Sequence, residues 1–171
     1  ITALTGTASV IIKGQSLHSC LGIGLANESS QRLYEKCKYK YKKTFNYLVL
    51  LNILIIDEIS MMNEELFDKI DDYLKFIRKS NKPFGGIQVI FIGDFAQLPP
   101  IEGNYCFLSK KWTTSNIEII ELTENMRQSD IEFQELLQDI RFSDRYCSDK
   151  TINILNQFIK SNIVIIIEIS N

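Results

Sequence analysis

Residues 54–62 constrain the fold of this chain more than any other stretch. An uninterrupted apolar run ends there at two adjacent carboxylates, Asp57 and Glu58. Such a run is typical of a strand buried in the centre of a parallel sheet. Ligands of these sheets bind outside the carboxyl ends of the strands, which is where the two acids fall. The stretch therefore predicts a site at Asp57 and Glu58, although the same acids could simply cap the next helix.

The two acids suit the hydrolysis of a nucleotide. A carboxylate such as Asp57 can hold Mg²⁺ through water, and one such as Glu58 can orient or deprotonate an attacking water. Another reading makes Asp57, Glu58 and Asp94 the metal ligands of a different kind of hydrolase. That reading requires more histidine or acidic ligands than one histidine and scattered carboxylates supply.

Strands and helices are predicted to alternate along the chain. In addition to the run before Asp57, strands are expected at residues 1–4, 87–92, 117–122 and 163–169, and helical segments at residues 8–13, 63–79, 129–142 and 152–159. Residues 15–19 are expected to form a polar loop that carries His18. This alternation is typical of an α/β fold with a largely parallel sheet flanked by helices.

Two of the predicted helices have clear start signals. Asn63 is a good N-cap, and Glu64 and Glu65 follow in the first turn, where the helix dipole favours anions. Ser129 and Glu132 have the spacing of a capping box. The apolar residues expected on the inner faces are Leu66, Ile70, Leu74 and Ile77 in the first helix, and Phe133, Leu136, Leu137 and Ile140 in the second.

Polar loops follow two more of the predicted strands. After residues 87–92 comes Gly93, where the backbone can turn sharply, and then a loop with two prolines that can hold the Gln97 side chain in place. After residues 117–122 comes a polar loop with Arg127. Because the carboxyl ends of parallel strands share one edge of a sheet, Gln97 and Arg127 are expected to face Asp57 and Glu58.

A basic segment interleaved with aromatic residues spans residues 35–43. Such a segment can follow a nucleic-acid backbone while its rings stack on bases. We favour the simpler interpretation, a solvated helix or loop that joins two strands. The net charge of −2 gives the whole chain no attraction to nucleic acid or membrane, so any such binding must come from local patches.

Length and composition exclude several classes of protein. The 171 residues are enough for one domain with a sizeable core. The four cysteines include no C-x-x-C pair and, with one histidine, offer no zinc set, so a reduced intracellular setting is expected. The apolar run at residues 47–56 is too short to cross a bilayer.

Several ordered stretches resemble motifs of the Pif1-type (RecD-like) DNA helicases of superfamily 1. Residues 54–62 resemble their Walker B stretch, residues 93–100 their third motif and residues 122–128 their fourth. Residues 1–9, with Gly14 and Leu17-His18-Ser19, are similar to the DNA-contacting motif that follows the phosphate loop. Residues 82–88 resemble the lead into the third motif. The matches are in the family's order and cover most of residues 1–142.

The resemblance implies a RecA-like P-loop NTPase fold for residues 1–142 and a role for individual side chains. Asp57 would bind Mg²⁺, and Glu58 would activate the hydrolytic water. Gln97 would sense the γ-phosphate and couple its loss to movement along DNA. Arg127 would be an arginine finger that neutralises charge in the transition state of phosphoryl transfer.

The resemblance also implies cofactors and partners. ATP with Mg²⁺ would be hydrolysed, and Thr5, Gly6 and His18 would contact single-stranded DNA, at its phosphates. The activity would be 5′-to-3′ unwinding of single strands and forks in DNA repair, recombination or telomere maintenance. In a eukaryote it would take place in the nucleus or the mitochondrion.

The chain departs from the family pattern in one motif. No G-x-x-x-x-G-K-[ST] occurs in it, and in the family this phosphate loop precedes the strand expected at residues 1–4. Residues 143–171 are expected to be a helix and a strand that lead toward a second motor domain. We therefore expect a fold truncated at both ends that is inactive alone and lacks tight ATP binding. The alternative is a degenerate remnant that binds DNA or protein without hydrolysis.

Overall fold

The computed structural model of this chain describes every residue except 125, 127, 144–145 and 161–171. It divides into two compact units, Ile1–Glu118 and Ile119–Asn171, and each is described by itself. The family-domain boundary predicted after Phe142 stays a prediction. The strand predicted at residues 163–169 lies outside the described residues.

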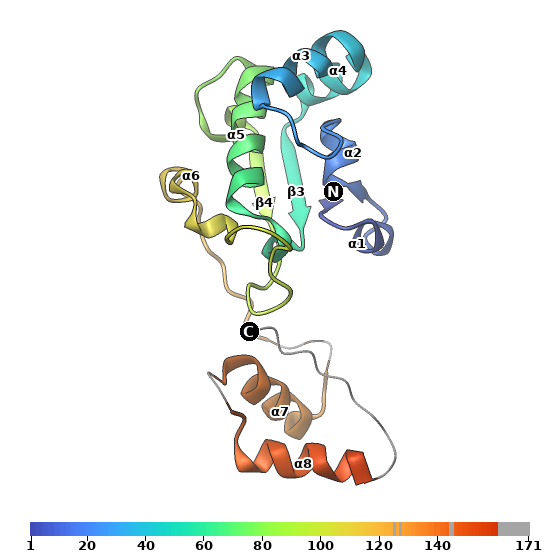
Figure 1. The fold of residues 1–171 in the computed structure, drawn as a ribbon, viewed down its shortest axis with the longest axis vertical. Helices are drawn as coiled ribbons and strands as arrows, with labels where there is room; N and C mark the ends of the chain where they lie inside the picture. The colour runs from blue at the N-terminus through green and yellow to red at the C-terminus, as the bar shows by residue number, and fades with distance from the viewer. Residues whose placement is uncertain (125, 127, 144–145, 161–171) are drawn as a thin grey trace. The chain divides into compact units, whose positions relative to one another are not determined.

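A parallel sheet is the framework of the first unit. Its strands are β1 (Thr2–Ala3), β2 (Gln15–Ser16), β3 (Ile53–Asp57) and β4 (Gln88–Phe91), in the order β2-β1-β3-β4. The strands β3 and β4 are labelled in Figure 1. Every pairing is parallel, and the register places Ala3 beside Asp57 and Ile56 beside Phe91. The predicted α/β fold with a parallel sheet is confirmed, and the carboxyl end of β3 lies between those of its two neighbours.

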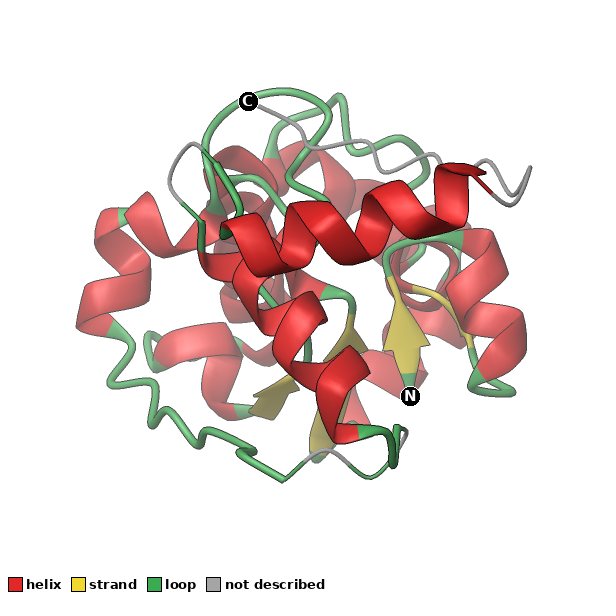
Figure 2. Ribbon diagram, turned by 90° about the horizontal axis from the view of Figure 1, so that it is seen from below, coloured by secondary structure: helices red, strands yellow, loops and turns green. Residues whose placement is uncertain are grey.

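The first unit also contains several helices (Figure 2). They are α1 (Gly6–Ile11), α2 (Leu17–Leu21), α3 (Ser30–Lys40), α4 (Lys42–Leu50), α5 (Glu64–Arg78) and α6 (Lys110–Thr114). Short 3₁₀ turns occur at Ile59–Met61, Pro83–Gly86 and Cys106–Leu108. None of the described helices is long and apolar enough to cross a membrane.

Helix α5 confirms its prediction. The Asn63 side chain caps it by accepting a hydrogen bond from the Leu66 backbone nitrogen at 2.8 Å. Ile70, Leu74 and Ile77 are buried as expected from their spacing, while Leu66 is half-buried. The helix therefore begins where a side-chain acceptor satisfies its free N–H groups, and its apolar stripe faces the core.

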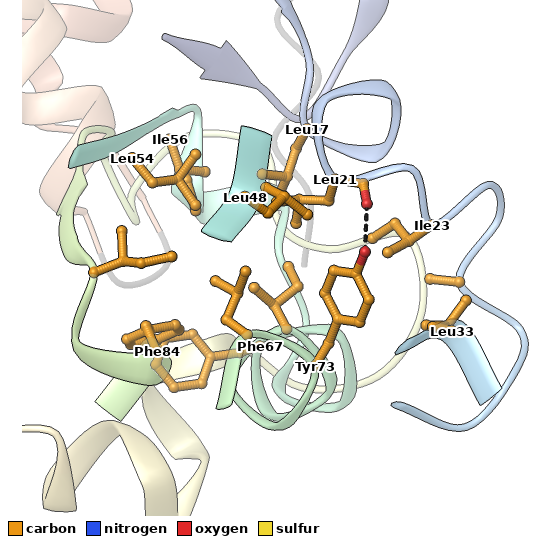
Figure 3. Close-up of a cluster of buried hydrophobic side chains, with 14 of the residues drawn as sticks. Leu17, Leu21, Ile23, Leu33, Leu48, Leu54, Ile56, Phe67, Tyr73 and Phe84 are labelled. Carbon is orange, nitrogen blue, oxygen red and sulfur yellow. Dashed lines mark hydrogen bonds between the residues drawn. The ribbon is translucent and has the colours of Figure 1, made fainter. Parts of the chain in front are cut away.

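The core lies around α5, between the sheet and the helices α2, α3 and α4 (Figure 3). The buried Phe67 ring packs against Phe84 and Phe91, with ring centroids 5.4 and 5.8 Å away. The Tyr73 hydroxyl donates a hydrogen bond to the Leu21 carbonyl oxygen at 2.8 Å, so this buried polar group is satisfied. These contacts attach α5 to β4 and to α2.

One face of the sheet is covered and the other is open. Leu54 and Ile56 of β3 are buried, whereas Ile53 is 50% exposed. On the same open face Ile90 and Ile92 are 40% and 48% exposed. The apolar run before Asp57 predicts cover on both faces, so this part of the prediction is wrong for the described residues. Residues of α2, α4 and α5 belong to the same buried core cluster as Leu54 and Ile56.

Residues 15–19 are not the predicted polar loop. Gln15 and Ser16 form β2 beside β1, and α2 begins at Leu17. The Ser16 hydroxyl caps α2 by accepting a hydrogen bond from the Ser19 backbone nitrogen at 3.3 Å. Edge strands and cap positions both tolerate polar residues, so the polarity of this stretch was a poor guide to its backbone.

Residues 117–122 do not form the predicted strand. The segment is irregular, and Ile119, Ile120 and Leu122 are largely exposed. A strand needs a neighbour that accepts and donates its backbone hydrogen bonds, and no described strand pairs with this segment. Its apolar β-branched composition is therefore insufficient by itself.

The second unit contains α7 (Ile131–Phe142) and α8 (Asp149–Lys160), which confirms two predicted helices. The cap is Asp130, whose carboxylate accepts a hydrogen bond from the Phe133 backbone nitrogen at 3.1 Å, so the predicted cap at Ser129 is wrong by one residue. A carboxylate interacts better than a hydroxyl with the positive end of a helix. Of the inner face, Leu136 is buried, Ile140 is half-buried, and Phe133 and Leu137 remain exposed.

A buried carboxylate connects α5 to the turn before β4. Asp71 accepts hydrogen bonds from the Phe84 backbone nitrogen at 2.8 Å and from the Lys75 ammonium at 2.6 Å, and the Lys111 ammonium lies 3.3 Å away. We expect Asp71→Ala to lower the free energy of unfolding by about 3 kcal/mol, because it leaves the buried Phe84 N–H and the Lys75 ammonium without their acceptor.

Urea unfolding measures this effect, and Glu65→Ala is the matched control. Glu65 pairs with Lys69 on the exposed side of the same helix, so its loss is expected to cost about 0.5 kcal/mol or less. Equal losses for the two variants would contradict the structural role of Asp71.

Candidate functional site

The Asp57–Glu58 turn is held from both sides by Ile92, the residue that directly follows β4. The Ile92 backbone nitrogen donates to the Ile56 carbonyl oxygen at 2.9 Å, and the Ile59 backbone nitrogen donates to the Ile92 carbonyl oxygen at 3.0 Å. Between these bonds Glu58 has φ 58° and ψ 43°. A left-handed conformation at a residue with a side chain costs about 1–3 kcal/mol and occurs preferentially at functional sites. The two hydrogen bonds thus impose a strained turn on Glu58.

Gly93 packs directly against this turn. A β-carbon at Gly93 would lie 2.9 Å from the Ile59 backbone nitrogen and 3.5 Å from the Glu58 carbonyl carbon. The residue also has φ 154°, which side chains rarely adopt. The sequence suggested that Gly93 allows a turn, but not that it makes room for the catalytic candidate on the neighbouring strand. Its place directly after an apolar strand was the available signal.

The carboxylates of the turn are open to a ligand. One Asp57 oxygen accepts a hydrogen bond from the Glu58 backbone nitrogen at 3.0 Å. The other Asp57 oxygen and both Glu58 oxygens form no hydrogen bond with any described residue, and both side chains are half-buried. A free, partly exposed carboxylate fits Mg²⁺ that arrives with nucleotide phosphates and keeps much of its water, with Asp57 as the protein ligand.

A site built only from protein ligands does not form among the described residues. No group of three or more His, Cys, Asp or Glu side chains there could hold a metal ion. Asp94 is engaged elsewhere, because its carboxylate accepts hydrogen bonds from the Ala96 backbone nitrogen and the Gln97 amide. The reading of Asp57, Glu58 and Asp94 as the ligands of another metal hydrolase therefore has no support.

A buried hydroxyl in the same turn lacks a partner. Ser60, two residues after Glu58, is fully buried, and its hydroxyl forms no hydrogen bond within the described chain. Buried polar groups are nearly always hydrogen-bonded, so the Ser60 hydroxyl is an unsatisfied hydrogen-bonding group next to the site.

Gln97 lies in the loop that follows β4, at the same edge of the sheet as Asp57. Its amide nitrogen donates to the Asp94 carboxylate at 3.2 Å, and its backbone nitrogen donates to the Asp94 carbonyl oxygen at 2.9 Å. The side chain is exposed and forms no direct hydrogen bond with Asp57 or Glu58. Asp94 therefore organises the loop that presents Gln97, a role that the sequence did not indicate.

The DNA-contact candidates follow β1 and β2. The Thr5 hydroxyl caps α1 by accepting a hydrogen bond from the Ala8 backbone nitrogen at 3.1 Å, and Gly6 is exposed. His18 is half-buried in α2, and burial lowers the pKa of its imidazole below the ordinary value. Thr5 and Gly6 thus lie at the carboxyl end of the strand beside β3, and His18 is held in its neutral form near pH 7.

Arg127 lies outside the described residues, so its predicted place beside Asp57 and Glu58 remains a prediction. The flanking Met126 is exposed and belongs to the second unit.

Comparison with known proteins decides the family. The family model described as "PIF1-like helicase" matches residues 1–148. The chain belongs to the PIF1-like helicase family. It is 42% identical over 147 residues to the ATP-dependent DNA helicase PIF1 of Emericella nidulans, covering 82% of this chain and 20% of that protein. It is 40% identical over 165 residues to the ATP-dependent DNA helicase RRM3 of Saccharomyces cerevisiae, covering 92% of this chain and 23% of that protein.

Solved helicase structures share the fold. The crystal structure of Pif1 helicase from Candida albicans matches 92% of this chain and 36% of its own, with 37% identity and a TM-score of 0.86. That of Pif1 helicase from Bacteroides in complex with ADP-AlF3 and ssDNA matches 92% of this chain and 39% of its own, with 30% identity and a TM-score of 0.75. The RecA-like fold expected from the motifs is thereby confirmed.

The contact between Gly93 and the Glu58 turn predicts a specific sensitivity. We expect Gly93→Ala to lower the free energy of unfolding by about 2 kcal/mol, because the added methyl group must displace backbone rather than a flexible side chain. Gly6→Ala is the control, since a β-carbon there meets no atom within 4 Å. Urea unfolding of both variants checks this, and an unchanged midpoint for Gly93→Ala would refute the close contact.

The buried imidazole predicts a pH dependence of stability. The pKa of His18 is lower in the folded chain than its ordinary value of 6.5, so the unfolded chain binds the proton more readily. Stability is therefore expected to fall as the pH drops through 6.5. His18 is the only histidine in the sequence. In His18→Gln, the free energy of unfolding measured with urea should therefore change less between neutral pH and about pH 5.5 than in the parent. An unaltered pH profile in the variant would contradict the burial of His18.

Proposed function

We propose that this chain is part of the first motor domain of an ATP-dependent DNA helicase. The observation that carries the proposal is the Glu58 turn: a strained left-handed residue at the carboxyl end of a central parallel strand, with free carboxylates, in a PIF1-like chain. Sites of nucleotide chemistry occur at this position in parallel sheets. The chain spans about a fifth of the length of the curated relatives described above, so the activity is proposed for the whole protein.

The proposed chemistry is attack of water on the γ-phosphate of ATP. Mg²⁺ bound with the nucleotide supplies charge neutralisation at the phosphates. Asp57 holds the ion through water, and Glu58 orients the attacking water and accepts its proton. The left-handed turn fixes the direction of the Glu58 side chain before the nucleotide arrives, which reduces the reorganisation needed in the transition state.

Gln97 and Arg127 complete the proposed site. Gln97, on the loop organised by Asp94, contacts the γ-phosphate and couples its release to movement on DNA. Arg127 stabilises the charge that develops during phosphoryl transfer. The phosphate loop and a second motor domain in the same polypeptide supply the remaining contacts.

Single-stranded DNA and DNA forks are the proposed substrates, moved 5′-to-3′ in repair, recombination or telomere maintenance. Thr5 and Gly6 offer backbone and hydroxyl groups to the strand. His18 contributes a hydrogen bond rather than a charge, since burial keeps its pKa low. Support comes from the match to a Pif1 helicase solved with ssDNA. If the source is a eukaryote, we propose that the helicase acts in the nucleus or the mitochondrion.

Glu58→Gln tests the proposal in the full-length protein that carries a phosphate loop. The variant keeps the size and shape of the side chain, but its amide cannot accept a proton. We expect ATP turnover to fall by about 10²-fold or more while nucleotide binding persists. Steady-state hydrolysis and equilibrium titration with ATP measure the two properties.

Glu65→Gln is the matched control, because Glu65 is exposed on α5 and outside the turn. Near-parental turnover of the Glu58 variant removes the motor assignment. Loss of binding in both variants would instead indicate a folding defect.

Arg127 is tested by two substitutions in the same full-length protein. We expect Arg127→Ala to reduce turnover with a much smaller change in ATP affinity, because its charge is needed mainly in the transition state. Arg127→Lys should also be impaired, since an ammonium cannot reproduce the planar guanidinium fork. Full rescue of turnover by lysine would exclude the arginine-finger role, whereas a parallel loss of affinity and turnover would make Arg127 a ground-state contact.

A further inference from the structure

The basic segment found in the sequence forms an exposed corner at the end of the sheet away from Glu58. Helix α3 ends at Lys40 and α4 begins at Lys42, and α4 leads through two residues into the amino end of β3 (Figure 1). Asp57 and Glu58 are at the other end of that strand, about 16 Å along it. The corner therefore lies apart from the site described above.

Positive charge is concentrated at this corner in an otherwise acidic chain. Residues 32–43 hold six of the 19 basic residues and one of the 21 acidic residues. Glu28 pairs with Arg32 and Lys36. Lys38, Lys40, Lys42 and Lys43 pair with no carboxylate among the described residues. These four ammonium groups lie within six residues and repel one another. A bound polyanion would reduce this electrostatic repulsion.

Aromatic rings are interleaved with these lysines. The Lys38 ammonium lies 5.6 Å from the Tyr34 ring centroid and 5.1 Å from that of Tyr39, and the Lys40 ammonium lies 5.7 Å from that of Tyr41. Tyr39 is 67% exposed and Tyr41 is also exposed. These contacts place the ammonium groups next to exposed rings. The lysines can therefore bind phosphates while the rings stack on bases of the same strand.

The tertiary structure adds a hollow beside the corner, between α3 and α5. Its volume is about 430 Å³, and its lining includes Tyr34, Phe76 and Lys79. The Tyr34 and Phe76 rings are 5.9 Å apart, and Phe76 is partly exposed. Asp72 also lines the hollow, but its carboxylate is paired with Lys111. The hollow thus presents two rings, with Lys79 at its rim forming no ion pair with a described carboxylate, 41 residues after Lys38 in the chain.

We propose that this corner, Lys38–Lys43 with the Tyr34–Phe76 hollow, is a second contact for single-stranded nucleic acid. The lysines bind successive phosphates, and a base stacks in the hollow. The contact is separate from the candidates Thr5, Gly6 and His18 and needs no nucleotide. It therefore does not depend on the ATPase chemistry of Glu58.

The charge part is tested by the salt dependence of binding. Fluorescence anisotropy with labelled oligothymidine measures the affinity of this chain between about 50 and 200 mM salt. In Lys40→Gln/Lys43→Gln the slope of log affinity against log salt should shrink by about 1.4, or 0.7 for each phosphate that is no longer neutralised. The control Lys82→Gln/Lys110→Gln removes the same charge from exposed lysines outside the corner.

An unchanged slope in the corner variant, or an equal change in both variants, overturns the proposal. Circular dichroism and thermal unfolding of each variant must match the parent. A polyglutamate chain that competes as well as oligothymidine also overturns it, because the corner would then bind polyanions without regard to bases.

The stacking part is tested by Phe76→Leu, which keeps apolar volume but removes the ring. Affinity for oligothymidine should fall about fivefold or more while the salt slope stays at the parental value. Parental affinity removes the hollow from the proposal. A blunt duplex of the same length should bind more weakly and be insensitive to this substitution, since its bases are already stacked. An equal loss with the duplex overturns the single-strand assignment.

Discussion

The pair of hydrogen bonds from Ile92 to Ile56 and Ile59 is the interaction on which the site depends. The backbone N–H and C=O of Ile92, directly after β4, bind the chain on either side of Asp57 and Glu58. The turn has no freedom to relax into an ordinary conformation while both bonds are kept. The strain at Glu58 is thus stabilised by the ladder between two parallel strands, and Gly93 allows those strands to approach closely enough.

This arrangement ties two functional segments together through backbone rather than side chains. The loop that carries Gln97 begins directly after Gly93, and the turn that carries Glu58 is bonded to the residue before it. A displacement of the loop therefore reaches Glu58 through a single hydrogen bond.

Two features of the first unit are energetically unfavourable in the described chain. The Ser60 hydroxyl is buried without a partner, and Ile53, Ile90 and Ile92 leave one sheet face half exposed. Both features cost free energy. The buried Ser60 hydroxyl has lost its hydrogen bonds to water, and the isoleucines leave apolar surface in contact with water. The basic corner at α3 and α4 is a third such feature, because Lys38, Lys40, Lys42 and Lys43 form no ion pair with a described carboxylate.

The sequence by itself determined the parallel α/β class, the helix from Asn63, and the positions of Asp57, Glu58 and Gln97 after strands. These follow from local signals: an apolar run ended by acids, a capping side chain and a stiff loop. It failed at residues 15–19 and 117–122, because strand pairing depends on partners that are distant in sequence. Only the tertiary structure decided the left-handed turn at Glu58, the clamp by Ile92 and the hollow between α3 and α5. The reason is physical: each joins residues about 30 to 45 positions apart, and composition or periodicity carries no information on contacts of that range.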